Sequence, residues 1–251
     1  AVASSLGSII GAVMVLFYIF NKSNKLSFYP IKLSSHSMIL MYRNVCYMVK
    51  LGFSAFLCEV ALGSMMFVGN ITFLNHMGNA GVAAFSVACY LIPIMFMVYE
   101  AIAQSAQPII SFNHGLGIRS RVIKAFMLSI ILSIICGLFF AIMLFCYTDV
   151  IVKLFINEGE EAHNIAIYGL PYFAIGLIPF AFNIVVIGYY QSVDRPRPAT
   201  IVTLLRGFVL LILSFYAMPM LMGDMGVWLA IAVAETFTAV YIIATSLLNR
   251  R

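Results

Sequence analysis

Charged side chains are scarce in this sequence: they make up 9% of its residues, against about a quarter in soluble domains. Hydrophobic residues make up 63%. Because so few charges cannot cover a water-facing surface, the composition excludes an ordinary soluble domain and predicts an all-α integral membrane protein. The net charge of +5 comes from basic residues confined almost wholly to alternate loops, which indicates membrane topology rather than nucleic-acid binding.

Ligand clusters and nucleophile–base pairs are also lacking. The five cysteines are scattered through apolar segments without paired spacing, so the sequence predicts neither a disulfide framework nor a zinc site. The four histidines lie on separate segments, and none lies inside an apolar stretch where it would serve as a catalytic base. Gly115 and Gly117 follow no predicted strand, so they do not form a nucleotide-binding motif. We therefore expect a protein that is not an enzyme and needs no cofactor.

Long apolar runs are abundant, and each is long enough to cross a bilayer. The predicted spans cover about 1–20, 50–73, 81–107, 124–147, 165–190, 200–222 and 227–248. Together they predict a polytopic bundle of seven transmembrane helices. The first span lacks a starting Met and a basic leader, so we expect the chain to begin inside a longer protein.

The distribution of basic residues predicts the orientation of these spans. Every Lys and Arg except Lys153 lies in the connection 21–50, in the turn around 119–124, or at 195–206 and the C-terminus. The intervening loops are acidic, with Asp149, Glu160 and Asp224 among their members. The positive-inside rule then places residue 1 outside the plasma (bacterial inner) membrane and the C-terminus in the cytoplasm. The connection 21–49 mixes polar and apolar residues, as does a helix lying along the membrane surface.

Ionisable side chains within apolar helices are costly and point to function. Glu59 shares one face of its predicted helix with Gly52, Gly63 and Asn70. Small residues on this face allow another helix to approach, and the polar pair provides a proton-binding or cation-coordinating capacity, with Na⁺ as one candidate. The alternative is that Glu59 is protonated and holds two helices together by a hydrogen bond.

Two further carboxylates lie in predicted spans. Glu100, Gln104 and Gln107 have helical spacing and form a polar stripe that either faces a ligand or packs against other helices. Glu235 lies in the last span, where we expect a role in packing between helices. For Arg206, near the inner end of its span, snorkelling to the cytoplasmic interface is a sufficient explanation.

Prolines and turn residues mark two places where helices should change direction. Pro108 weakens the helix before a turn in which Asn113 and Gly115 offer turn conformations. Pro171 and Pro179 lie within one apolar span, which predicts a bent helix. The strongest polar group in that span is Asn183, which we place with Asn70, Glu100, Gln104 and Gln107 as a candidate for the substrate or cation pathway.

Four stretches together resemble the multidrug and toxic compound extrusion (MATE) transporters. They are KLGFSAFLCEVALGSMM, QPIISFNHGLGIRSRVIKAF, YYQSVDRPRPATIVTLLR and GVWLAIAVAE. MATE transporters have twelve spans in two lobes, and the resemblance runs from the sixth span to the twelfth. It implies that 1–20 is the last helix of an N-terminal lobe of the same polypeptide, that 21–49 joins the lobes in the cytoplasm, and that 50–251 is a six-helix C-terminal lobe.

The resemblance also implies a function. It points to an antiporter, driven by Na⁺ or H⁺, that exports amphipathic and cationic organic compounds or drugs by alternating access. Glu59 matches the family's cation-coupling glutamate, and Gln107, Pro108, Asn113 and Gly115 match the exit of its eighth helix. The chain departs from the family in the fifth predicted span, which carries Asn183 in place of an acid and leaves the coupling ion open. The alternatives are a seven-helix receptor and a lipid-linked sugar flippase of the related superfamily.

Overall fold

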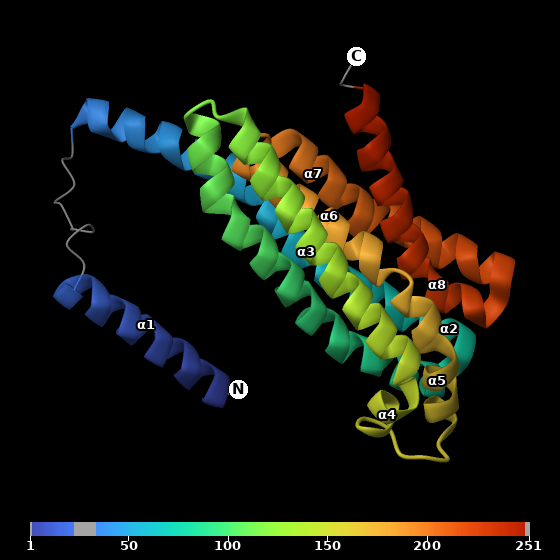
Figure 1. Cartoon of the computed structure of the whole chain (residues 1–251). Helices are drawn as coiled ribbons and strands as arrows, with labels where there is room; N and C mark the ends of the chain where they lie inside the picture. Colours follow the sequence, from blue (N-terminus) through green and yellow to red (C-terminus); the bar gives the residue numbers. More distant parts are fainter. Residues whose placement is uncertain (1, 23–33, 249–251) are drawn as a thin grey trace. The chain divides into compact units, whose positions relative to one another are not determined.

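The computed structural model describes residues 2–22 and 34–248 (Figure 1). The chain divides into two compact units, Ala1–Cys46 and Tyr47–Arg251. The described part of the first unit consists of α1 (Val2–Lys22) and the beginning of α2 (Ser35–Gly115). Ser34 caps α2, because its hydroxyl accepts a hydrogen bond from the Ser37 amide at 3.3 Å.

All regular elements in the described part of the second unit are helices. After α2 come α3 (Arg119–Cys146), α4 (Thr148–Lys153), α5 (Glu161–Ala174), α6 (Leu177–Ser192), α7 (Pro196–Leu204), the π-helix η1 (Leu205–Val209) and α8 (Leu210–Leu248). The seven predicted spans lie on α1 to α8 and η1, apart from residue 1, which is outside the described residues, Tyr147, which follows α3, and Ile175 and Gly176, which lie between α5 and α6. The all-helical prediction is confirmed.

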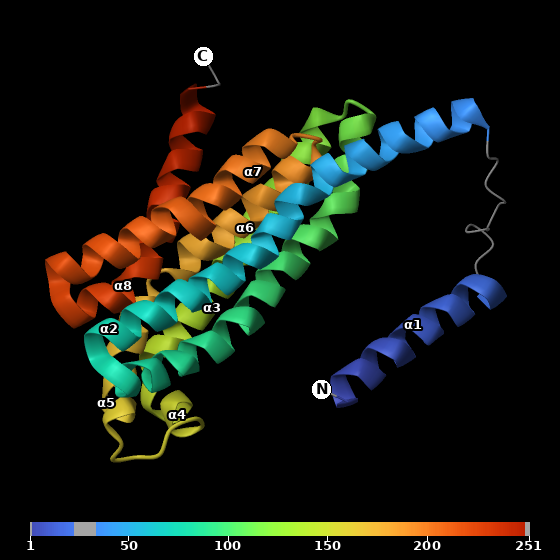
Figure 2. The same ribbon diagram turned by 180° about the vertical axis from the view of Figure 1, so that it is seen from behind.

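Two of the long helices fold back on themselves at a glycine. Gly78 in α2 has φ 62° and ψ −155°, and Gly223 in α8 has φ 59° and ψ −138°. Residues with a Cβ avoid this backbone conformation, so glycine is required where the helix reverses. The two arms of α2 run side by side in Figure 2, and the hairpin of α8 is visible in both views. The predicted spans 50–73 and 81–107 thus lie on the two arms of the α2 hairpin. The arms of the α8 hairpin likewise belong to the predicted spans 200–222 and 227–248.

Among the described residues, length and composition make three segments suitable for crossing a membrane, namely α2, α3 and the continuous stretch Pro196–Leu248. The pair α5 and α6 adds a fourth if it is taken as one broken span, bent by 49°. The bend falls between Pro171 and Pro179, as the sequence predicted. The count of seven crossings remains a prediction.

Apolar side chains cover the outside of the bundle as well as its inside. On α3, Leu128 is 68% exposed and Phe139 61%, as suits helices surrounded by lipid. Inside, Phe73 of α2 stacks on Phe85 with ring centroids 4.4 Å apart and meets the edge of Trp228 at 4.7 Å. This aromatic cluster joins both arms of α2 to α8 near their glycine bends.

Candidate functional site

A buried ion pair lies inside the second unit. Arg206 of η1 and Glu235 of α8 have side chains that are 5% and 3% exposed. The Arg206 Nη2 donates to Glu235 Oε1 at 2.6 Å, and the Nε donates to Oε1 at 3.1 Å and to Oε2 at 3.2 Å. Charge-assisted contacts of this kind hold both groups in one geometry.

Two residues of α6 complete the surroundings of this pair. Asn183 donates through Nδ2 to Glu235 Oε2 at 2.7 Å and to the Glu235 carbonyl at 2.9 Å. Its own Oδ1 is buried and has no hydrogen-bond partner among the described residues. Phe180 lies under the guanidinium, with its ring centroid 4.6 Å from Cζ, a distance suited to a cation–π contact. We call Arg206, Glu235, Asn183 and Phe180 the ionic cluster.

Small residues bring the helices of the ionic cluster together. A Cβ added to Gly207, next to Arg206, would overlap the Cβ of Ala61 in the first arm of α2. A Cβ on Gly176, at the α5–α6 bend, would lie 2.8 Å from the Ala232 Cα in α8. The π-helical turn also inserts an extra residue locally, which changes the direction in which Arg206 projects. Glycine contacts and the π turn together carry this arginine into the bundle.

The prediction that Arg206 snorkels to the interface is wrong, because its side chain is buried and bonded to Glu235. The prediction that Glu235 takes part in packing between helices agrees with its bonds to η1 and α6. Sequence analysis missed the partnership because the two residues lie on different helices and no periodicity connects them. The available signal was one Arg and one Glu inside consecutive apolar stretches. Opposite charges within a membrane cost least when they pair with each other.

Glu59 has a different environment. It is exposed on the first arm of α2 and has no hydrogen bond or ion pair within the described ranges 2–22 and 34–248. Gly52 and Gly63, on the same face, have nothing within 4 Å of an added Cβ, so no helix of the described chain makes the close approach we expected there. The neighbouring Cys58 is buried and lies within electrostatic range of Glu59, Glu100 and Arg206.

Some of the polar side chains in the stripe on the second arm of α2 have hydrogen-bond partners among the described residues, and others do not. Glu100 is half-buried and accepts a hydrogen bond from Gln104 Nε2 at 3.1 Å, and Gln107 is also half-buried. Ser111, which continues the stripe, donates to the Ser192 carbonyl at the end of α6 at 3.0 Å. The stripe therefore contacts α6 at one end and presents Gln104 at the surface.

The two candidate asparagines, Asn70 and Asn183, differ in whether they bond within their own helix or to another one. Asn70 is half-buried and donates to the Met66 carbonyl of its own helix at 2.9 Å, whereas Asn183 bonds across to α8. The structure brings Asn183 to Glu235 and leaves Asn70 apart from both.

The turn between α2 and α3 is built differently from our expectation. Helix α2 continues through exposed Pro108 and buried Asn113 to Gly115, and the residue with positive φ is Gly117, at 73°. Asn113 Nδ2 donates to the Ile109 carbonyl at 2.8 Å, and the Asn113 carbonyl accepts from the Ile118 amide at 2.9 Å. Asn113 thus closes the helix end while Gly117 makes the turn.

Comparisons with known proteins agree with this architecture. A protein-family model described as MatE matches residues 55–217. The multidrug export protein MepA of Staphylococcus haemolyticus (strain JCSC1435) is 27% identical over 261 residues, which cover 99% of this chain and 54% of that protein. The chain thus spans about half the length of this curated relative.

Solved structures show the same relation at the level of the fold. The outward-facing conformation of a multidrug resistance MATE family transporter of the MOP superfamily has a TM-score of 0.83 and 16% identity, covering 98% of this chain and 55% of that one. A MOP superfamily transporter from Pyrococcus furiosus has a TM-score of 0.80 and 16% identity, covering 94% and 52%. The family match extends over more than half of the sequence, so this chain belongs to the MATE family of membrane transporters, and its structure corresponds to about half of one of them.

Proposed function

We propose that this chain is one lobe of a cation-coupled antiporter that exports amphipathic, cationic organic compounds by alternating access, with Glu59 as the coupling carboxylate. Membership of a transporter family favours this function over a seven-helix receptor. The observation that carries the assignment is that Glu59 lies in a long apolar helix and has no partner in the described part of the chain. Glu235, another carboxylate within an apolar helix, is already bonded to Arg206 and Asn183.

The chemistry of a coupling group supports Glu59 over Glu235. A coupling carboxylate must gain and lose a proton or Na⁺ as the site is opened to one side and then the other. An unpartnered carboxylate in apolar surroundings must be neutralised by a proton, an ion or a cationic ligand. Glu235 is held by a guanidinium, which keeps its charge satisfied without any exchange. Asn183, where this chain departs from the family by lacking an acid, fits the assignment of coupling to Glu59 because it donates a hydrogen bond to Glu235.

The test is ion-driven efflux of ethidium from cells carrying the full-length protein. Glu59→Gln keeps the size and hydrogen-bonding capacity of the side chain but removes its charge, so we expect normal expression and melting temperature with loss of efflux. Glu158→Gln, in an exposed loop, is the matched control and should transport normally. Normal transport by the Glu59 variant would show that the coupling site lies elsewhere.

We further propose that the α2–α3 turn and the start of α7 face the cytoplasm, on the basis of their arginines. Cysteines introduced at Glu160 and Asp224 should then react with a membrane-impermeant reagent added from outside, whereas cysteines at Arg121 and Arg197 should not. The opposite pattern of labelling would invert the topology.

A further inference from the structure

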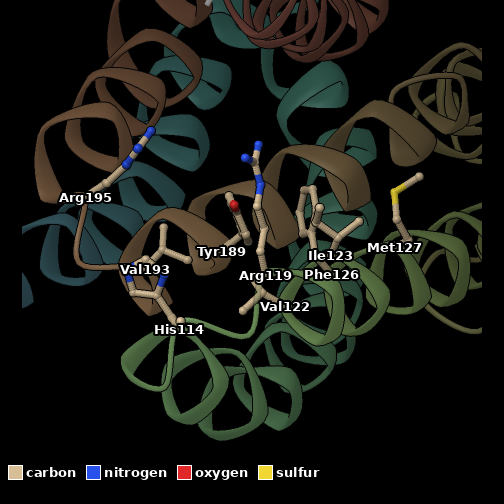
Figure 3. Close-up of a pocket in the computed structure, with 10 residues that line it drawn as sticks. His114, Arg119, Val122, Ile123, Phe126, Met127, Tyr189, Val193 and Arg195 are labelled. Atoms are coloured by element: carbon tan, nitrogen blue, oxygen red, sulfur yellow. The ribbon is translucent and has the colours of Figure 1, made fainter. Parts of the chain in front are cut away.

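A cavity of about 600 Å³ lies where the α2–α3 turn meets the end of α6 and the start of α7. Arg119, the first residue of α3, and Arg195, immediately before α7, both line it, together with His114 and Tyr189. In Figure 3 the two arginine side chains extend in the same direction from these separate elements. No carboxylate is among the lining residues.

Neither arginine is neutralised by a neighbour. Within residues 2–22 and 34–248, no ion pair involves Arg119 or Arg195. The acid next to Arg195 in the sequence, Asp194, lies close enough to Tyr47 of α2 to raise the pKa of that phenol, and it does not line the cavity. Two unpaired guanidinium groups at one cavity attract an anion and repel the cationic compounds proposed as the transported substrates. Guanidinium groups match phosphate oxygens in geometry as well as in charge.

The rest of the lining is apolar. Val122, Ile123, Phe126 and Met127 form one side, and the Phe126 ring lies 4.1 Å from that of Tyr189. Ile123 is 46% exposed and Met127 52%, so the cavity continues onto the outer apolar surface of α3. A soluble anion has no use for such a surface. An amphiphile with an anionic head and a hydrocarbon tail satisfies both parts of the lining.

We propose that this cavity binds an anionic phospholipid, with its phosphate between Arg119 and Arg195 and one acyl chain along Ile123, Phe126 and Met127. Basic pockets between membrane helices at the cytoplasmic surface recognise lipid head groups by the same chemistry. Bound lipid would add a further link between the α2–α3 turn and the α6–α7 connection, which already meet through the Ser111–Ser192 hydrogen bond and the packing of Val122 with Val193. This role is independent of ion coupling at Glu59.

The chain offers a matched control for each arginine. Arg121 and Arg197 lie two residues further along α3 and α7, are exposed, and do not line the cavity. The pair Arg119→Gln/Arg195→Gln and the pair Arg121→Gln/Arg197→Gln therefore remove the same charge from the same two segments of the chain. All four side chains are exposed, so both proteins should fold, which their melting temperatures in detergent will verify.

The experiment is native mass spectrometry of the purified full-length protein with dioleoyl phosphatidylglycerol or dioleoyl phosphatidylcholine. We expect the wild-type protein to prefer phosphatidylglycerol and the cavity pair to weaken that binding roughly 25-fold, about fivefold for each guanidinium. The control pair should change it by no more than about twofold, because more distant charges are screened. Excess inorganic phosphate should not displace the lipid. Equal losses in the two pairs, absence of a head-group preference, or displacement by phosphate would each overturn the proposal.

Discussion

A buried ion pair and a surface lysine paired with two carboxylates have similar distances and opposite surroundings in this protein. Arg206 and Glu235 meet at 2.6 Å with side chains that are 5% and 3% exposed. Lys153 in α4 lies 2.5 Å from Asp149 and 2.9 Å from Glu158, with 39%, 51% and 69% of the three side chains exposed. Distance alone therefore says little about importance. What differs is the state of each charge when its partner is removed.

Water replaces a lost partner at the surface but not in the bundle. A Lys153 ammonium without its carboxylates is simply hydrated, and the free energy of unfolding hardly changes. An Arg206 guanidinium without Glu235 stays inside an apolar assembly, where an uncompensated charge is strongly unfavourable. Each charge of the buried pair therefore needs the other to remain in the interior, and the pair as a whole need not add net stability. Its value lies in fixing η1 against α6 and α8.

The largest effect should follow from breaking the buried pair. Glu235→Gln leaves Arg206 buried without a counter-charge, and we expect the free energy of unfolding to fall by about 3–5 kcal/mol. The measurement is the melting temperature and the folded yield of the full-length protein in detergent. Glu158→Gln, which removes an exposed carboxylate, is the control and should behave like the wild type.

A double variant separates the charge from the packing. Arg206→Met with Glu235→Leu removes both charges while keeping apolar volume, so it should be more stable than Glu235→Gln alone. If Glu235→Gln melts like the wild type, loss of the carboxylate does not leave Arg206 as an uncompensated buried charge. The comparison between the two pairs would then fail. If the double variant is the least stable of all, the pair contributes net stability beyond its mutual neutralisation.

An intermediate effect should come from the glycine contacts that position Arg206. Gly207→Ala places a methyl group against Ala61 of α2, which must displace η1, and we expect a loss of about 1–3 kcal/mol. Gly63→Ala is the matched control, because it lies one turn from Glu59 on the open face of α2 and meets nothing within 4 Å. It should be neutral or stabilise its helix by up to about 1 kcal/mol. Equal melting temperatures would mean that the contact at Gly207 does not position the pair.

The sequence predicted the elements of this fold better than their partnerships. Apolar length predicted the helices, and Pro171 and Pro179 predicted the bend between α5 and α6, since each of these signals is local to one segment. The resemblance of a few short stretches to MATE transporters is confirmed by the family match over residues 55–217. The reversals at Gly78 and Gly223 fall in the predicted loops, where non-helical backbone at each glycine separates the spans on either side.

The interior of the candidate site could not be predicted in the same way. Arg206 and Glu235 are 29 residues apart, and their meeting depends on a π-helical turn and on the close contact at Gly207. Neither feature has a reliable signature in a single sequence. Because Arg206 is near the inner end of its predicted span, we expected its side chain to reach the interface, but η1 directs the side chain inward. Glu59 lies on an exposed face without the neighbouring helix that we expected there, and its role in cation coupling remains a prediction.

The smallest effect should come from the surface pair. Hydrogen bonds from Lys153 to Asp149 and then to Glu158 raise the pKa of Lys153 above its usual range. A raised pKa in the folded state means that the stabilisation is complete below the unfolded-state pKa of about 10.4 and is lost only as the pH rises beyond it. Lys153→Gln should therefore lower the melting temperature slightly, and by the same amount at every pH from neutral to about 10. Added salt should shrink even this difference, because the pair is open to solvent. Melting curves of the variant and the wild type at low and high salt test the point, and a loss as large as that of Glu235→Gln would remove the distinction between the two pairs.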